Sequence, residues 1–386
     1  MQIVPKSELG EKPLRRFRIV HFIHLDGDGG GPYTVSKHIT FYSHFHHVHI
    51  VHGGRGRISE TCEELGIPHT RIESATLLDT LLSFPILVGI ILNLKPDLFV
   101  IHGQWAGPIG ALAGRLACVR RILYVAHWPS YFTDWNLFLV VRNWVAEWLP
   151  CRLAHRTILI SRANWVTYHQ MFPWLKGKVS LLSNSVDEGE LPTERDILEV
   201  RRRHRWQPDR VHIVSVGRLV DQKRVDWLLD AWAGCRDLWS EATLWIVGDG
   251  PERAALEKVA LAHGFGDSCH FLGSQPKGIV YIAAADITVF TSLYESFGNV
   301  TLEAMICGKP IIASRVPGIE STLEDRKQGF LVAPGDKTEM ASKLRQLVRN
   351  ATLRREMGES GKRRVRHFLT LLVLPRFLQI VNELLK

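Results

Sequence analysis

An alternation of short apolar runs with helical patterns constrains the fold most, and it occurs in two successive series. Strand-like runs of the first series lie at residues 17–24, 48–52, 98–102, 122–126, 157–161 and 179–182. Those of the second series lie at residues 211–216, 242–247, 269–272, 287–291, 310–314 and 329–332. Such alternation predicts parallel sheets with helices on both faces. We therefore expect an α/β protein with two doubly wound, Rossmann-like domains that face a deep cleft.

The charged and polar stretch 187–210 separates the two series and predicts a linker with a short helix. Residues 340–386 have a helical pattern, and Pro375 is a candidate kink. We predict four parts: an N-terminal extension over 1–16, a first domain over 17–190, a second domain over 191–365, and a C-terminal helix over 366–386 that could return to the first domain.

Composition and segment patterns limit the class of protein. A hydrophobic content of 46% over 386 residues is enough for full cores. The six cysteines form no C-x-x-C pair or zinc spacing, so we expect reduced thiols in the cytoplasm. No apolar segment of a signal peptide precedes the first charges. The longest apolar run, 77–94, is interrupted by Asp79, Pro85 and Asn93, so no membrane-spanning helix is expected.

The net charge of +9 predicts an attraction to phosphates of a nucleotide, a nucleic acid or an anionic lipid. No motif that recognises bases is present, so we expect no nucleic-acid partner. The aromatic and basic stretch 135–156 allows two interpretations. It is either a helix in peripheral contact with an anionic membrane or a core helix with a charged outer face.

Residues 294–312 (YESFGNVTLEAMICGKPII) carry two carboxylates eight positions apart, Glu295 and Glu303. The pattern predicts a strand end, a small-residue loop and a helix, and the start of such a helix suits a phosphate. Glu303 in the first helical turn could accept hydrogen bonds from a ribose diol, and Glu295 could reach the hydroxyls of an attached sugar. In the alternative interpretation Glu303 only complements the helix dipole and Glu295 is a solvated loop residue.

A second candidate site is the segment VGRLVDQK, in which Gly217 permits a tight turn after a strand. Arg218 and Lys223 place two cations at the end of that strand. Two cations suit a diphosphate leaving group, whose negative charge grows as a glycosidic bond breaks. The alternative is a solvated basic loop.

Two further positions are weaker candidates. Gly248, in VGDGP after the next strand, either lines a cleft or serves only a structural turn. His127 follows a strand and could hydrogen-bond a sugar hydroxyl, although a lone histidine is more often structural.

The glycine-rich segment HLDGDGGGP follows the first strand, where Gly30 and Gly31 let the backbone approach an anion. A dinucleotide fingerprint would need glycine where Pro32 stands, and an acidic residue is missing after the next strand. We therefore expect no nicotinamide cofactor. Asp26 and Asp28 match a D-x-D metal motif only by letters, and we expect no metal.

Several segments in this order and spacing resemble the retaining GT-B glycosyltransferases of family 4. These segments are GRLVDQK, VGDGPE, SLYESFGNVTLEAM, GKPIIAS, VPGIES, GFLVAPGD and, more loosely, GGGPYTVSKHI and KVSLLSNSVD. The resemblance covers residues 17 to the end. One departure is Ser185, where the family often has glycine.

The resemblance implies a role for each matching residue. Glu295 would contact the donor sugar, Glu303 the ribose, and Arg218 and Lys223 the diphosphate. His127 would point toward the donor sugar. The implied backbone contacts to the donor come from Gly30, Gly31, Phe297, Gly298, Asn299 and Val300.

The resemblance also implies an activity. The enzyme would move a sugar, with retention and without a metal or other cofactor, from a UDP-, GDP- or similar nucleotide-sugar to a hydroxyl of a glycan or lipid-linked acceptor. Surface polysaccharide biosynthesis at the inner face of the membrane would be the pathway. Two alternatives stay open: a nucleotide-sugar epimerase of the same fold, which needs no acceptor groove, and a non-catalytic nucleotide-sugar-binding protein.

Overall fold

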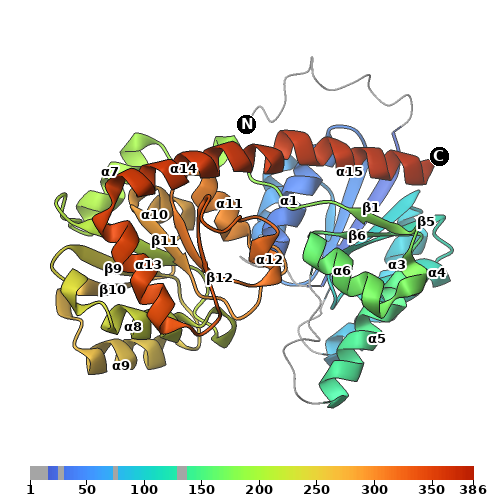
Figure 1. Ribbon diagram of the computed structural model, residues 1–386. Helices are drawn as coiled ribbons and strands as arrows, with labels where there is room; N and C mark the ends of the chain where they lie inside the picture. Colours follow the sequence, from blue (N-terminus) through green and yellow to red (C-terminus); the bar gives the residue numbers. More distant parts are fainter. Residues whose placement is uncertain (1–15, 25–29, 73–76, 128–136) are drawn as a thin grey trace. The chain divides into compact units, whose positions relative to one another are not determined.

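The computed structural model describes residues 16–24, 30–72, 77–127 and 137–386, and it divides into two compact units (Figure 1). The first unit comprises Met1–Asn184 and Leu371–Lys386, and the second comprises Ser185–Thr370. The division after residue 184 lies six residues before the boundary that we expected after residue 190. The division after residue 370 lies five residues beyond the boundary expected after residue 365.

Seven parallel strands form the sheet of the first unit in the order β3-β2-β1-β4-β5-β6-β7. Their bounds are β1 Arg18–Ile23, β2 His47–His52, β3 His69–Arg71, β4 Leu98–His102, β5 Arg121–Ala126, β6 Arg156–Leu159 and β7 Val179–Leu181. The central strands β1, β4 and β5 are buried along almost their whole length. Burial on both faces is what a parallel sheet covered by two helical layers requires.

Helices cover both faces of this sheet (Figure 1). Their bounds are α1 Gly30–Ser43, α2 Arg57–Leu65, α3 Leu77–Leu94, α4 Gly107–Leu116, α5 Leu137–Leu153, α6 Arg162–Met171 and α15 Thr370–Leu385. Residues of α3, α4, α5 and α6 share one apolar core with the sheet. The C-terminal helix α15 packs on α1, since the ring of Phe377 lies 4.8 Å from that of His38 and 4.9 Å from that of Tyr42.

Six parallel strands form the sheet of the second unit in the order β10-β9-β8-β11-β12-β13. Their bounds are β8 Val211–Val216, β9 Ala242–Val247, β10 Cys269–Gly273, β11 Ile287–Phe290, β12 Ile311–Ser314 and β13 Gly329–Val332. In both sheets the order reverses beside the first strand, next to β1 and next to β8. Ligands of such open sheets bind outside the carboxyl ends of the strands at this switch point.

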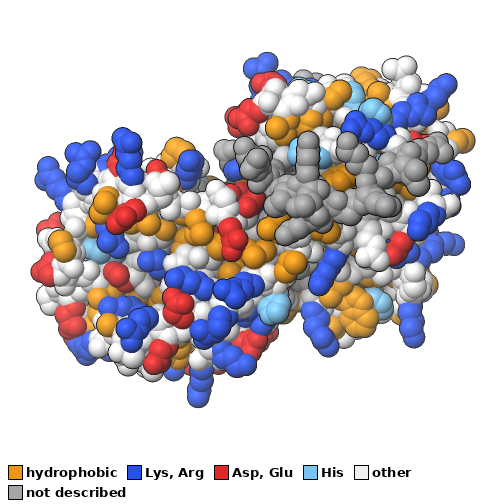
Figure 2. Space-filling view, turned by 90° about the horizontal axis from the view of Figure 1, so that it is seen from above, with side chains coloured by type: hydrophobic (Ala, Val, Ile, Leu, Met, Phe, Trp, Pro, Cys, Tyr) orange, Lys and Arg blue, Asp and Glu red, His pale blue; other side chains and the backbone are white. Residues whose placement is uncertain are grey.

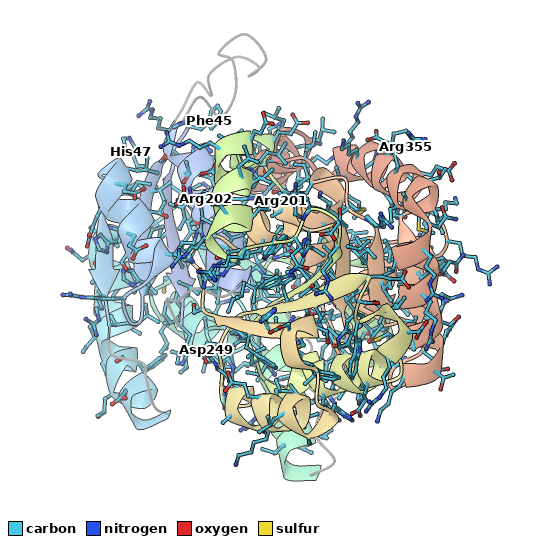
Figure 3. All side chains as sticks on the ribbon, turned by 90° about the vertical axis from the view of Figure 1, so that its left-hand side faces the viewer. Phe45, His47, Arg201, Arg202, Asp249 and Arg355 are labelled. Carbon is cyan, nitrogen blue, oxygen red and sulfur yellow. The ribbon has the colours of Figure 1, made fainter. Side chains whose placement is uncertain are left out.

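The helices of the second unit are α7 Glu194–Arg203, α8 Val225–Ala233, α9 Arg253–His263, α10 Gly278–Ala284, α11 Asn299–Ile306, α12 Pro317–Glu320, α13 Lys337–Arg349 and α14 Ala351–Val365. Residues of α8, α9 and α13 form the main core with the sheet. Helix α7 is attached to α10 because Arg201 donates from Nε and Nη2 to the Ala284 carbonyl at 3.1 and 2.8 Å. Figure 3 labels Arg201 and Arg202 on α7.

The two-sheet α/β architecture that we expected is confirmed, and four predicted strands (β4, β8, β9 and β13) have the observed bounds. Strand β3 was missed. The expected first-turn position of Glu303 is wrong, since α11 begins at Asn299 and Glu303 is its fifth residue. Pro375 lies inside α15, which continues to Leu385. Across the described parts of the chain, no helix combines the length and apolar character needed to cross a membrane.

Candidate functional site at the switch point of the second sheet

The loops after β8 and β11 meet because these strands are neighbours at the switch point of the second sheet. Three hydrogen bonds join the loops. The Leu293 N–H donates to the Gln222 carbonyl at 2.8 Å, and the Gln222 side chain donates to the Tyr294 carbonyl at 3.0 Å. The Thr291 hydroxyl donates to the Lys223 carbonyl at 2.8 Å. Residues 72 positions apart in sequence are thereby held in one place.

Lys223 and Glu295 form an ion pair between these loops, from Nζ to Oε1. The Ser292 hydroxyl donates to the same carboxylate oxygen at 2.8 Å. The two charged side chains are only 25% and 12% exposed, so they are better shielded than an ordinary surface pair. The structure therefore pairs two residues that the sequence analysis assigned to different parts of a donor, Lys223 to the diphosphate and Glu295 to the sugar.

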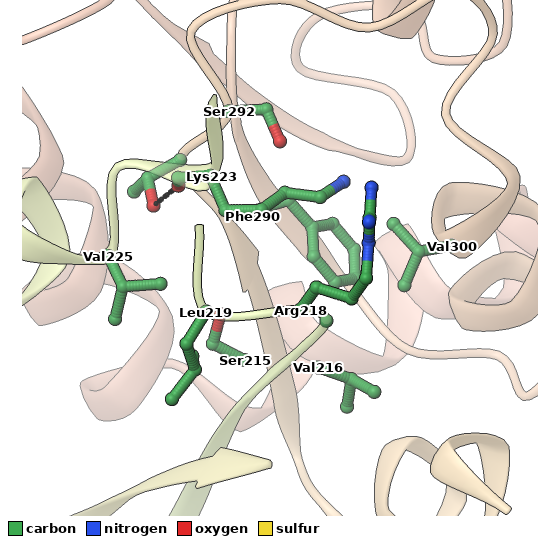
Figure 4. Close-up of a pocket in the computed structure, with 11 residues that line it drawn as sticks. Ser215, Val216, Arg218, Leu219, Lys223, Val225, Phe290, Ser292 and Val300 are labelled. Atoms are coloured by element: carbon green, nitrogen blue, oxygen red, sulfur yellow. Dashed lines mark hydrogen bonds between the residues drawn. The ribbon is translucent and has the colours of Figure 1, made fainter. Parts of the chain in front are cut away.

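A pocket opens beside this ion pair, and both predicted cations line it (Figure 4). The Arg218 and Lys223 side chains extend toward the same space, next to Ser292 and Val300. Arg218 is exposed and Lys223 half-buried. Two cations beside one pocket form an arrangement that can hold an anion with two phosphate groups.

The start of α11 forms the side of the pocket that contains Val300. Gly298 is the N-cap in the left-handed region, with φ of 81°, which favours glycine. Phe297 is buried and its ring meets that of Phe368 edge-on at 5.9 Å, so only its backbone is suited to contact a ligand. Asn299 is the first residue of the helix and lies at the positive end of the helix dipole.

Glu303 lies deeper in α11 than predicted, and it has a carboxylate neighbour that the sequence did not reveal. Glu190, in the short 3-10 helix Glu188–Glu190, has its pKa raised to about 7 by burial first and by the charge of Glu303 second. Glu303 is half-buried. No sequence pattern links the two residues, because the start of the second unit approaches α11 only in the folded chain.

Gly217 and Gly248 lie at the ends of neighbouring strands and are packed against each other. The Gly217 N–H donates to the Val247 carbonyl at 3.0 Å. A Cβ built on Gly248 would lie 1.8 Å from the Gly217 carbonyl oxygen, and the φ of Gly248 is 141°. Backbone packing alone therefore demands glycine at 248. Gly217 itself lines the pocket.

The other predicted site residues, Gly30, Gly31 and His127, lie in the first unit. Gly30 is the first residue of α1, and a Cβ built on Gly31 meets no described atom within 4 Å. His127 follows β5 directly and is half-buried. The Asp26 and Asp28 pair lies outside the described residues.

The sequence did not single out His21 or His102, although these polar residues interrupt otherwise apolar buried strands. His21 Nδ1 lies 2.9 Å from His102 Nε2, and His102 Nδ1 lies 3.5 Å from His127 Nε2. Burial lowers the pKa of His127 to about 4, so its ring is neutral near pH 7. All six cysteines are free thiols. The described side chains include no cluster of three or more histidine, cysteine or acidic groups placed to hold a metal.

Comparisons with known proteins agree with this geometry. Residues 196–364 match the family model "Glycosyl transferases group 1". The chain is 33% identical over 149 residues to the lipopolysaccharide core biosynthesis glycosyltransferase LpsE of Rhizobium meliloti, which covers 39% of this chain and 43% of that protein. It is 30% identical over 187 residues to N-acetyl-alpha-D-glucosaminyl L-malate synthase of Bacillus anthracis, covering 48% of this chain and 49% of that protein. The chain spans less than half the length of these curated relatives.

Among solved structures, Anabaena HepE in complex with UDP-glucose matches with a TM-score of 0.83 and 22% identity, over 96% of this chain and 100% of that one. This likeness establishes the fold. Residues 196–364 are thus similar to the group 1 glycosyltransferases, and the two parallel sheets of the chain have the GT-B fold.

Proposed function

We propose that this protein is a retaining glycosyltransferase that moves a sugar from a nucleotide diphosphate sugar to a hydroxyl group. One observation carries the proposal: Arg218, Lys223 and Glu295 converge at the switch point of the second sheet. Arg218 and Lys223 would bind the diphosphate, while Glu295 would bind hydroxyls of the donor sugar. Glu303 would bind the ribose.

The donor class is supported by the solved relative that contains UDP-glucose. The helix start at Asn299 offers N–H groups to the phosphates, and Gly30 and Gly31 would let the first unit contribute backbone to them. We propose a UDP-, GDP- or similar nucleotide-sugar as donor.

The same residues suggest how the transfer proceeds. As the glycosidic bond breaks, negative charge grows on the leaving diphosphate, and the Arg218 and Lys223 cations stabilise it. The departing phosphate oxygen would accept the proton of the attacking hydroxyl on the same face of the sugar, so the configuration is retained. This route uses no protein nucleophile and no metal, because the two cations supply the charge.

We further propose a glycan or lipid-linked acceptor, in surface polysaccharide biosynthesis. The lipopolysaccharide core relatives support this choice. Helix α5 presents exposed Val141, Trp144 and Val145, and Arg142 and Arg152 lie on the same helix. Such a surface suits peripheral contact with an anionic membrane on the cytoplasmic side. On the face drawn in Figure 2, basic and acidic side chains are interspersed, which does not favour a nucleic-acid partner.

The test is a thermal-shift screen of nucleotide-sugars followed by product analysis. A donor present at about 100 times its dissociation constant should stabilise the protein by about 2.7 kcal/mol. With that donor and a glycan or lipid-linked acceptor, the new linkage should keep the anomeric configuration of the donor, and turnover should survive EDTA. An inverted linkage, or turnover lost in EDTA and restored by manganese, would contradict the mechanism. Isomerised sugar from the donor alone would favour the epimerase.

A further inference from the structure

Three histidines form a linear hydrogen-bonded chain inside the first unit. His21 lies in the middle of β1, His102 ends β4, and His127 follows β5. His102 uses both ring nitrogens, Nε2 toward His21 at 2.9 Å and Nδ1 toward His127 at 3.5 Å. Neighbouring ring planes differ by only 12° and 24°. The chain thus links the buried interior of the sheet to the candidate donor-sugar residue at its carboxyl edge.

Each of these rings is neutral near pH 7 and has a proton on only one of its two nitrogens. Burial lowers the pKa of His21 to about 3 and that of His127 to about 4. The pKa of His102 is well below its ordinary value because of burial first and the neighbouring histidines second. A neutral imidazole has one donor and one acceptor nitrogen. All hydrogen bonds in the chain must therefore run in the same direction, and the tautomer of one ring fixes the other two.

The inner end of the chain decides that direction. His21 is fully buried, and within the described part of the molecule its Nε2 has no hydrogen-bond partner. A buried N–H without an acceptor is rarer in proteins than a buried acceptor without a donor. The proton of His21 then lies on Nδ1 and is donated to His102. His102 in turn donates from its own Nδ1 to Nε2 of His127.

We propose that His21 and His102 are positioning residues that hold His127 in its Nδ1–H tautomer, so that His127 presents a fixed hydrogen-bond donor to a ligand oxygen. That oxygen would belong to a hydroxyl of the donor sugar, and this part rests on the proposed function. His127 then has no free nitrogen to act as a base. The proton of the acceptor hydroxyl is left to the departing phosphate, as the proposed mechanism requires.

The tautomer can be measured without any substrate. Long-range proton–nitrogen NMR of the full chain, labelled with nitrogen-15 in its histidine rings, distinguishes protonated from unprotonated nitrogens at about pH 7.5. The His127 signals are identified by their loss in His127→Asn. We expect Nδ1 to be protonated and Nε2 unprotonated. A His127 ring protonated on Nε2 would overturn the proposal.

A pair of variants separates positioning from general stabilisation. His102→Phe keeps a ring but removes both nitrogens of the link. His52→Phe is the matched control, because His52 Nε2 and His69 Nδ1 also lie 2.9 Å apart with ring centroids at 5.2 Å, on the same sheet but outside the chain. We expect His102→Phe to change the His127 tautomer and His52→Phe to leave it unchanged. An equal effect, or no effect, of the two variants would contradict the proposal.

Turnover gives a second readout. We expect His102→Phe to lower kcat/KM about 10-fold, the scale of one well-oriented neutral hydrogen bond, and His52→Phe to leave it unchanged. His127→Asn, whose amide still donates, should retain more activity than His127→Phe. If His127 is the Nδ1–H tautomer but the protein transfers no sugar, only the proposed function fails. If it transfers sugar with His127 protonated on Nε2, only this inference fails.

Discussion

The two sheets share the strand order around their switch points but place opposite kinds of polar group there. In the second unit the loops after β8 and β11 present charges, with Lys223 and Glu295 paired beside a solvent-open pocket. In the first unit the strands β1 and β4 bury His21 and His102, at 0% and 2% exposure, with pKa values that keep them neutral. One unit is therefore suited to neutralise an anion and the other to direct uncharged hydrogen bonds.

This difference follows from desolvation. At the loops of the second unit Arg218 is exposed to water, while the shielded charges of Lys223 and Glu295 are paired with each other, so these charges cost little to hold ready for a phosphate. Within the first sheet a charged imidazole would be costly, and the structure keeps its polar groups neutral and linked to one another. The carboxyl edges of the two sheets thus differ in chemistry: one presents charged side chains in loops, and the other presents neutral histidines that are buried in the strands.

The largest expected effect tests the charged side of the comparison. Arg218→Ala or Lys223→Ala removes a cation from the proposed diphosphate site and should lower kcat/KM about 30- to 1000-fold, equivalent to about 2–4 kcal/mol. Steady-state kinetics with the identified donor would measure it. Arg349→Ala is the control, since this exposed cation on α13 pairs only with Asp237 and Glu241 among the ion pairs observed for it. Equal activity of all three variants would contradict the assignment.

The next effect tests the neutrality of the first unit. Glu147 on α5 is fully buried and accepts hydrogen bonds from the Tyr124 and Tyr168 hydroxyls at 2.7 and 2.6 Å. Burial raises its pKa from 4.5 to about 7, against the opposing effect of these two bonds. The folded state therefore resists deprotonation. The contribution of the protonated Glu147 carboxyl to the free energy of unfolding is fully present below pH 4.5. This contribution, about 3 kcal/mol, is lost as the pH rises through 7.

Glu147→Gln, which stays neutral, should remove this loss. Urea unfolding at about pH 5 and pH 8 should show wild type losing stability relative to the variant at the higher pH. A difference between the two proteins that does not change with pH would show that Glu147 is already charged when folded, and the contrast between the units would weaken.

A smaller effect compares one glycine from each unit. Gly248→Ala should cost about 1–3 kcal/mol or more of stability, because its Cβ would overlap the Gly217 carbonyl. Gly31→Ala should leave stability nearly unchanged, since its Cβ meets no described atom, but should weaken donor binding if the backbone there approaches the diphosphate. Thermal unfolding and donor titration measure both. Unchanged binding in a folded Gly31→Ala would remove Gly31 from the donor site.

The smallest expected effect concerns the sugar end of the charged site. Glu295→Ala should lower kcat about 10- to 30-fold while nucleotide binding changes less, because the carboxylate would contact the sugar and not the base. Calorimetric titration of the free nucleotide beside kinetics of transfer gives the two numbers. Equal losses in both would contradict the separate role of Glu295.

The sequence predicted much of the fold because the buried strands are continuous apolar runs with clear ends. Strand β3 was missed because its three residues, His69–Arg71, carry no apolar side chain, and it pairs only with β2 at the edge of the sheet. The helix α11 began one residue earlier than its apolar pattern, since Gly298 can adopt the left-handed cap. Because the helix begins one residue earlier than predicted, Glu303 is its fifth residue and lies outside the first turn.

The sequence predicted the residues of the site, each from its own local motif, but it did not predict the contacts between them. Arg218, Lys223 and Glu295 were chosen from local patterns, but their meeting depends on β8 and β11 being neighbours, which no local pattern encodes. The hydrogen bond between His21 and His102 joins residues that are 81 positions apart. Glu190, at the start of the second unit, lies near Glu303 only in the folded protein. Such couplings follow from strand order and from the path of the chain.

The most direct test of the central claim is calorimetric titration of UDP, GDP and ADP into wild type, Lys223→Ala and Arg349→Ala. The account predicts that at least one nucleoside diphosphate binds wild type and Arg349→Ala equally, and Lys223→Ala at least about 10-fold more weakly. Binding of none of the three to wild type, or equal binding to Lys223→Ala, would contradict a diphosphate site at the switch point of the second sheet.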